Sequence, residues 1–155
     1  ILNELTKLMD ETQKGDTVFF YFAGHGDVVV NEENKDEGFL LASDANENRN
    51  YFGTSGVVAL KHLDSVISVV TNKGAKFVLT LDACRSGFLY KEGTQKNLET
   101  FNNNFQHSTK FFSCKPSEYS LESQDIGHGY FTYYLVLGLL GASDYFVQDN
   151  NLQYF

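Results

Sequence analysis

One cysteine and one histidine have the residue types and the surroundings that thiol chemistry needs. Cys84 ends an apolar, β-branched stretch that starts at residue 75, and an Arg-Ser-Gly turn follows it. His25 stands between two glycines, shortly after the apolar run 16–22. Attack of a thiol on an acyl carbon requires a group that moves protons and donors that stabilise the oxyanion. The pair therefore predicts Cys84 as a nucleophile and His25 as its general acid and base.

Two buried strands are expected to position these residues. Stretches as apolar as 16–22 and 75–81 are typical of strands that lie in the interior of a sheet. Parallel strands end at the same edge of a sheet, and ligands of α/β proteins bind there. The glycines beside His25 predict a sharp turn that leaves the imidazole exposed. The backbone N–H groups of Gly26 and Cys84 are the expected oxyanion donors.

The rest of the chain alternates between helical and extended patterns. Ser55 is the expected cap of the second helix. Apolar periodicity predicts helices over 1–14, 55–71 and 127–140, and further strands over 38–42 and 109–114. This order predicts an α/β fold with an open, mainly parallel sheet that crossover helices flank.

Composition narrows the class of protein. A chain of 155 residues with 42% apolar and 21% charged residues fits one globular domain. A net charge of −8 argues against a nucleic-acid partner. Two cysteines make no disulfide framework, and no signal peptide is recognisable, so we expect a cytoplasmic protein. The longest apolar run, 130–140, is shorter than the roughly 20 residues that span a bilayer, so no membrane partner is expected.

Two motifs carry a resemblance to a known family. Phe-Tyr-Phe-Ala-Gly-His-Gly at 20–26, together with Asp-Ala-Cys-Arg-Ser-Gly at 82–87, resembles the caspase-like cysteine peptidases, and most closely their bacterial and metacaspase branch. Segments 113–120 and 127–139 resemble the small-subunit strand and helix of that family. The resemblance therefore spans roughly residues 16–141.

The resemblance implies one caspase-like peptidase domain over residues 1–155. Residues 1–87 would form a large-subunit-like part, 88–106 an intersubunit linker, and 107–155 a small-subunit-like part. Nothing in 1–15 supplies the strand with which the family usually opens, so the sheet is expected to lack its first strand. Because the chain opens on Ile, we expect it to be a piece of a longer protein.

By this resemblance Cys84 and His25 form the catalytic dyad of a peptidase that needs no organic cofactor. Asp82 stands where metacaspases carry an aspartate that lines the first specificity pocket and selects Arg or Lys. A carboxylate pairs well with a guanidinium in bidentate geometry. The alternative is that Asp82 only caps the turn that follows it.

Other candidate residues follow from the same alignment. Ser113 and Glu118 would line the pocket from the small-subunit side. Ala23 would line it where metacaspases often have serine, so one pocket hydroxyl is absent. Lys91 and Lys96, in the linker, would be self-cleavage sites if the enzyme prefers basic residues. An uncut loop is the alternative for this segment.

No metal site is predicted. The acidic residues between 32 and 37 could bind calcium, which activates some metacaspases, but they lack the alternating spacing of a calcium loop. We interpret them as a solvated loop. The expected partners are a peptide or protein substrate and the remainder of a longer chain or a regulatory protein.

Two other functions compete with a peptidase that cuts after Arg or Lys. One is a catalytically silent caspase-like scaffold, against which the intact His25 and Cys84 argue. The other is a different thiol enzyme, such as a glutamine amidotransferase. Those enzymes usually place the cysteine before the histidine in the chain, whereas here the order is reversed.

Overall fold

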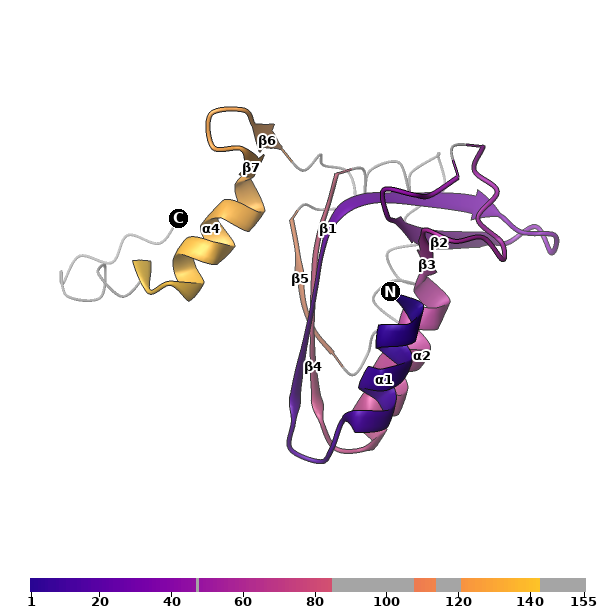
Figure 1. Ribbon diagram of the computed structural model, residues 1–155, viewed down its shortest axis with the longest axis horizontal. Helices are drawn as coiled ribbons and strands as arrows, with labels where there is room; N and C mark the ends of the chain where they lie inside the picture. The colour runs from indigo at the N-terminus through magenta and orange to yellow at the C-terminus, as the bar shows by residue number, and fades with distance from the viewer. Residues whose placement is uncertain (47, 85–107, 114–120, 143–155) are drawn as a thin grey trace.

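The structure is a computed structural model, and it describes residues 1–46, 48–84, 108–113 and 121–142. Five strands form one sheet in the order β3-β2-β1-β4-β5 (Figure 1). They are β1 (Thr17–Val30), β2 (Asp36–Leu41), β3 (Val57–Ala59), β4 (Lys76–Cys84) and β5 (Ser108–Phe112). The three parallel strands β1, β4 and β5 are the part that carries the predicted catalytic residues.

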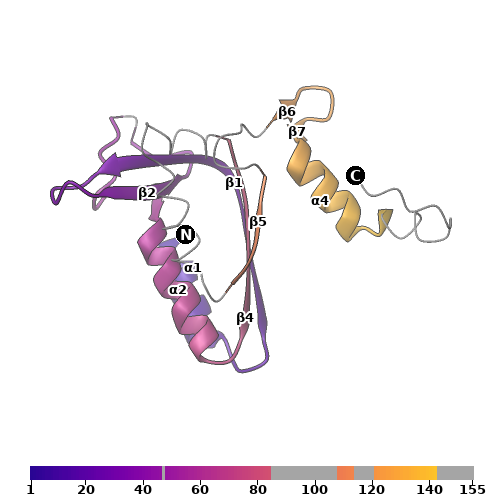
Figure 2. The same ribbon diagram turned by 180° about the vertical axis from the view of Figure 1, so that it is seen from behind.

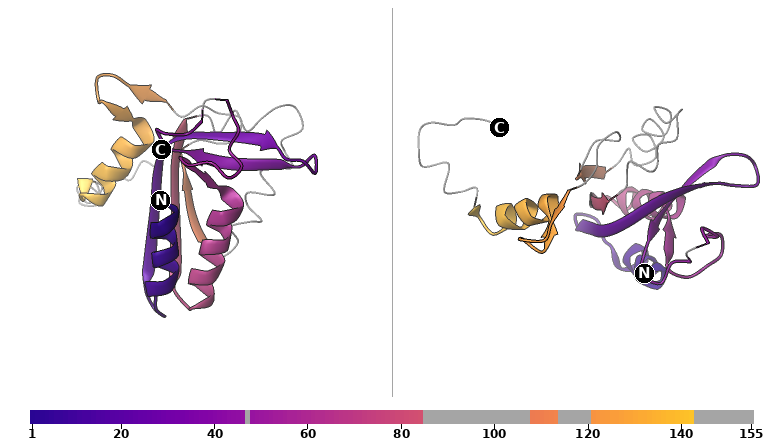
Figure 3. Two further views of the ribbon diagram at one scale, coloured as in Figure 1. Left: turned by 45° about the vertical axis from the view of Figure 1, so that its right-hand side comes forward. Right: turned by 90° about the horizontal axis from the view of Figure 1, so that it is seen from above.

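Helices lie on both sides of the sheet. Helix α1 (Leu2–Glu11) and helix α2 (Leu60–Asn72) cover one side, and helix α4 (Tyr130–Leu139) lies on the other (Figures 1 and 2). A two-stranded ribbon, β6 (Glu122–Ser123) with β7 (His128–Gly129), leads directly into α4 (Figure 3). These observations confirm the predicted α/β class.

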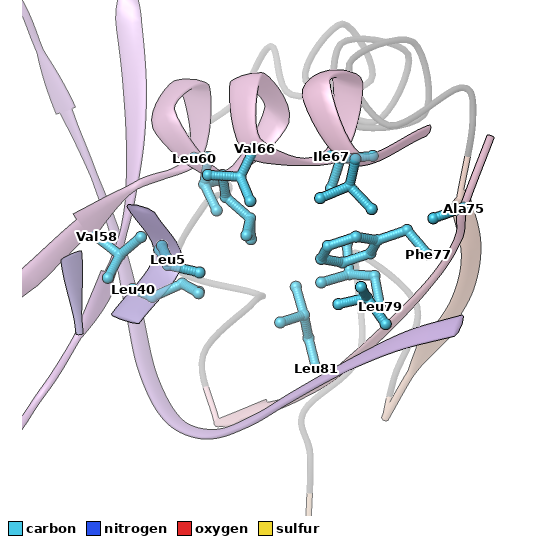
Figure 4. Packing of buried hydrophobic residues seen from close by; sticks show 13 residues of the cluster. Leu5, Leu40, Val58, Leu60, Val66, Ile67, Ala75, Phe77, Leu79 and Leu81 are labelled. Carbon is cyan, nitrogen blue, oxygen red and sulfur yellow. The ribbon is translucent and has the colours of Figure 1, made fainter. Parts of the chain in front are cut away.

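The core lies between α2 and β4. Leu63, Val66, Ile67 and Val70 recur every three or four residues along α2, and all are at most 1% exposed. They pack with alternate residues of β4, which are Phe77, Leu79 and Leu81 (Figure 4). Because this packing buries one whole face of β4, it fixes which face of the strand remains for the site.

Strand β1 alternates between the two sides of the sheet. Val18 is buried in the core, and Phe20 and Phe22 pack against it. On the opposite side Phe19 is 52% exposed and Tyr21 is 39% exposed. His25 belongs to this second set, so its predicted exposure is confirmed.

Two local predictions were wrong. Gly24 and Gly26 make no sharp turn, because residues 25–30 continue β1 and pair with β2 in antiparallel register. Ser55 does not cap a helix, because β3 comes first and α2 begins only at Leu60. Gly56 has a φ of 76° and its carbonyl accepts from the N–H of Ala42, which directs the following β-branched residues onto β2.

The sheet is mixed. Strands β1, β4 and β5 are parallel as predicted, whereas β2 and β3 are antiparallel additions to one edge. One short connection, residues 31–35, joins β1 to β2, and a short connection suits antiparallel neighbours. The predicted linker 88–106 lies outside the described residues.

Candidate active site

His25 and Cys84 occupy directly opposed positions on neighbouring strands. The parallel pairing of β1 with β4 begins at Thr17 opposite Lys76 and ends at His25 opposite Cys84. Neighbouring strands lie about 4.8 Å apart, so the two backbone positions are adjacent. The tertiary structure thus brings together the two residues that the sequence predicts as the nucleophile and its base.

His25 is also where β1 changes its partners. It is opposite Leu41 of β2 as well as Cys84 of β4, and the antiparallel pairing with β2 continues to Val30. A catalytic side chain at the point where a strand leaves its parallel neighbour is open to a ligand at the sheet edge. The exposed position of His25 agrees with that placement.

The two glycines that flank His25 differ in whether packing around them requires glycine. A Cβ on Gly24 would lie 3.0 Å from the ring of Phe22, so a side chain there would displace a ring that packs on the core. A Cβ on Gly26 would meet only the carbonyl of Phe39, at 3.5 Å. Packing therefore explains Gly24, whereas Gly26 is not required by sterics.

Asp82 is a buried carboxylate beside this pair. It precedes Cys84 by two residues on β4, lies opposite Ala23 of β1, and is only 5% exposed. Its Oδ2 accepts a hydrogen bond from the backbone N–H of Thr132, at 3.3 Å, and another from the Thr132 hydroxyl. The structure therefore connects Asp82 to the first turn of α4.

The structure describes some of the other predicted pocket residues and not others. The backbone N–H of Ser113 donates to the carbonyl of Leu81 at 3.1 Å, so Ser113 lies beside the end of β4. Ala23 is opposite Asp82. Glu118, and the predicted self-cleavage sites Lys91 and Lys96, lie outside the described residues.

Sequence reasoning assigned no role to Tyr21 or Thr132. The hydroxyl oxygen of Tyr21 lies 2.6 Å from that of Thr132, which in turn contacts Asp82. Tyr21 lies on the same face of β1 as Ala23 and His25, because side chains alternate along a strand. Thr132 is a polar residue in an otherwise apolar helix. These two patterns are the signals that could have identified them.

A second polar cluster braces β1 beyond His25. The carboxylate of Asp27 accepts from Arg49 Nε at 2.7 Å, from Arg49 Nη2 at 2.6 Å and from the Tyr51 hydroxyl at 2.8 Å. The hydrogen bonds to Asp27 raise the pKa of Arg49, and burial followed by the contact with Asp27 raises the pKa of Tyr51. The cluster ties the loop after β2 to the strand that carries His25.

The acidic segment that follows β1 is engaged by basic side chains. Glu33 contacts Lys35 Nζ at 2.6 Å, and Glu37 contacts Lys61 Nζ at 2.7 Å. Hydrogen bonds from Lys61 and Asn31 lower the pKa of Glu37. Across the described ranges, no three His, Cys, Asp or Glu side chains are grouped closely enough to hold a metal ion.

Comparison with known proteins decides the family. A peptidase-family model described as the caspase domain matches residues 1–147. The chain belongs to the caspase family. This assignment confirms the resemblance seen in the two motifs, and it places the chain among cysteine peptidases.

A curated relative of this caspase-family chain is Metacaspase-1 of Plasmodium falciparum (isolate 3D7), which is 30% identical over 132 residues. The match covers 79% of this chain and 21% of the relative, so the chain spans about a fifth of that protein's length. No solved structure matches the chain. Among the described helices, none is long and apolar enough to cross a bilayer.

Proposed function

We propose that this caspase-family chain is a cysteine endopeptidase that hydrolyses peptide bonds after Arg or Lys. The observation that carries the proposal is the register of β1 and β4, which sets His25 opposite Cys84 at the last pair of the parallel pairing. A cysteine and a histidine on adjacent strands fit the nucleophile-and-base arrangement of thiol peptidases.

The proposed reaction uses the two side chains in turn. His25 takes the thiol proton, and the Cys84 thiolate attacks the carbonyl carbon of the scissile bond. The N–H groups of Gly26 and Cys84 stabilise the resulting oxyanion. His25 then protonates the leaving amine, and a water molecule hydrolyses the thioester with His25 as the base. Thiol and imidazole supply the nucleophile and the proton transfers, so this chemistry needs no metal and no organic cofactor.

Asp82 is the proposed determinant of the preference for basic residues. It stands two residues from the nucleophile and opposite Ala23, and its carboxylate is almost wholly buried. A buried carboxylate attracts a guanidinium or ammonium group more strongly than an exposed one, because water screens it less. Ser113 and Glu118 are proposed to complete the pocket, and the hydrogen bond from the Ser113 N–H to the Leu81 carbonyl supports this role for Ser113.

The division of the chain follows the same proposal. Residues 1–87 and 107–155 would be the two parts of one peptidase domain, and the linker 88–106 would be cut at Lys91 or Lys96 by the enzyme itself. We propose that the chain acts in the cytoplasm on protein substrates, under the control of the rest of a longer chain or of a regulatory partner.

A positional-scanning peptide library tests the proposal. The wild-type chain is expected to cleave after Arg and Lys, and an acyloxymethyl ketone that ends in Arg is expected to label Cys84. Cys84→Ala is expected to abolish both, whereas Cys114→Ala, which removes the other cysteine, is expected to retain both. Absence of cleavage and of labelling in the wild-type chain would support a silent scaffold instead.

A further inference from the structure

We propose that Tyr21 and Thr132 form a hydrogen-bond chain that holds the Asp82 carboxylate in place to receive a basic substrate side chain. This inference rests on the proposed function, and it gives roles to two residues that do not belong to the dyad. Both would be positioning residues, because they act through Asp82.

The direction of the hydrogen-bond chain is set by which groups can donate a proton. An ionised carboxylate only accepts hydrogen bonds, so the single hydroxyl proton of Thr132 points to Asp82. The Tyr21 hydroxyl, 2.6 Å from the Thr132 oxygen, must then be the donor in that contact. The sequence of donors runs from Tyr21 to Thr132 to Asp82, and it ends on the group that would carry the negative charge.

The backbone of α4 reinforces this arrangement. The N–H of Thr132, in the first turn of the helix, donates to the same carboxylate oxygen at 3.3 Å. Gly129, the residue before the helix, permits the close approach, since a Cβ there would lie 2.8 Å from Oδ2 of Asp82. The positive end of the helix dipole favours a negative charge at this place.

The hydrogen-bond chain joins three separate elements of the fold. Tyr21 comes from β1, Asp82 from β4, and Thr132 from the helix on the far side of the sheet from α1 and α2 (Figure 1). Asp82 precedes the proposed nucleophile by two residues. Docking of α4 therefore orients a carboxylate next to Cys84 before any substrate binds, which lowers the ordering cost of capturing a cation.

Isosteric variants separate positioning from mere folding. Thr132→Val removes the hydroxyl, Thr132→Ser keeps it, and Tyr21→Phe removes the first donor. Two peptides that differ only in Arg or Gln before the scissile bond are compared. Thr132→Val is expected to lower the Arg-over-Gln ratio of kcat/KM about 10- to 100-fold, the range for a hydrogen bond to a charged group, mainly through KM. Thr132→Ser is expected to restore the ratio.

The two positions are expected to be coupled. Tyr21→Phe is expected to lower the ratio less than Thr132→Val, and the double variant is expected to match Thr132→Val alone, since Tyr21 acts through that hydroxyl. Tyr133→Phe removes a tyrosine hydroxyl from the next residue of α4, whose ring contacts that of Tyr134. It is the matched control and is expected to leave the ratio unchanged. Equal losses with both peptides would show a folding defect and would overturn the inference.

A binding measurement keeps this test independent of catalysis. The same two peptides are titrated by calorimetry into Cys84→Ala protein with and without Thr132→Val. A loss of affinity for the Arg peptide alone supports the hydrogen-bond chain from Tyr21 to Asp82. This holds even if the wild-type protein proves inactive, because inactivity would refute only the proposed reaction. Equal affinity for both peptides in the Cys84→Ala protein, or a preference that the added Thr132→Val change leaves unaltered, would overturn the role given to Thr132.

Discussion

His25 and Cys84 form the last pair in the parallel register of β1 and β4, and His25 is at the same time opposite Leu41 of β2. The strand that carries the imidazole thus leaves one neighbour and joins another at this residue. The ladder with β2 continues past His25, whereas the pairing of β4 with β5 ends at Leu81, three residues before Cys84. The carboxyl end of β4, where ligands of α/β sheets bind, therefore extends beyond its pairing with β5.

Substitution of His25 tests the proposed dyad. His25→Ala is expected to reduce single-turnover cleavage of an Arg peptide by at least about a thousandfold, because no other group would move the proton. Alkylation of Cys84 by iodoacetamide near neutral pH is expected to slow as well, since the imidazole promotes thiolate formation. Wild-type turnover in His25→Ala protein would exclude His25 from the reaction.

Asp82→Asn tests the proposed specificity pocket. The variant keeps the shape of the side chain and removes its charge, so the preference for Arg over a neutral residue is expected to fall by about 2–5 kcal/mol, the range for breaking a buried charge pair. Competing hydrolysis of Arg and Gln peptides measures the preference. Asp10→Asn, on the exposed side of α1, is the control for the loss of one charge. An unchanged Arg preference would remove Asp82 from the pocket.

Gly129→Ala is predicted to disturb the same carboxylate sterically. The added Cβ would lie 2.8 Å from Asp82 Oδ2, so the carboxylate or the helix start must shift. We expect a loss of about 1–3 kcal/mol in the free energy of unfolding, as for other overpacked sites, together with a raised KM for Arg peptides. Gly138→Ala, which meets no atom within 4 Å, is the control and is expected to stabilise α4 by up to about 1 kcal/mol. Equal effects of the two changes would contradict the contact.

The Asp27 cluster is predicted to stabilise the strand beyond His25. Asp27→Asn removes the charge that Arg49 contacts through two nitrogens and that Tyr51 contacts through its hydroxyl. The free energy of unfolding, measured with urea, is expected to fall by about 1–2 kcal/mol. Glu33→Gln breaks an exposed pair with Lys35 and is expected to cost less than about 0.5 kcal/mol. A larger loss of unfolding free energy in Glu33→Gln than in Asp27→Asn would contradict a stabilising role of the cluster.

Glu37 is predicted to contribute to acid sensitivity. Contacts with Lys61 and Asn31 lower its pKa from 4.5, so the folded state favours the ionised carboxylate. Its stabilising contribution is complete above pH 4.5 and is lost as the pH falls through the lower folded value. Glu37→Gln should therefore be less stable than wild type near pH 7, and the difference should shrink toward about pH 3 in urea titrations. A constant difference across this range would mean that the charge is not responsible.

Several features of the fold and of the candidate site could be predicted from local sequence patterns. The apolar runs before His25 and Cys84 were enough to predict two interior strands, because a strand in the middle of a sheet has no polar face to show. The helical period of α2 and the β-branched and aromatic run of β5 are also local features of the sequence, so both elements could be predicted. The two motifs together were specific enough to indicate the caspase family.

Other features depended on contacts between distant segments. Val57 and Val58 fit a helical pattern, yet pairing with β2 placed them in a strand, since cross-strand contacts override weak helix propensity. Pairing of 25–30 with β2 likewise kept the backbone extended at Gly24 and Gly26.

What the sequence by itself determined was the order of the three helices and of the strands β1, β2, β4 and β5, the family, and the identity of the candidate nucleophile and base. Only the tertiary structure decided that His25 faces Cys84 in register, and that Asp82 receives its hydrogen bonds from Thr132 and α4. The reason is physical: residue types and periods are local properties of the chain, whereas register and burial arise only when segments far apart pack against one another.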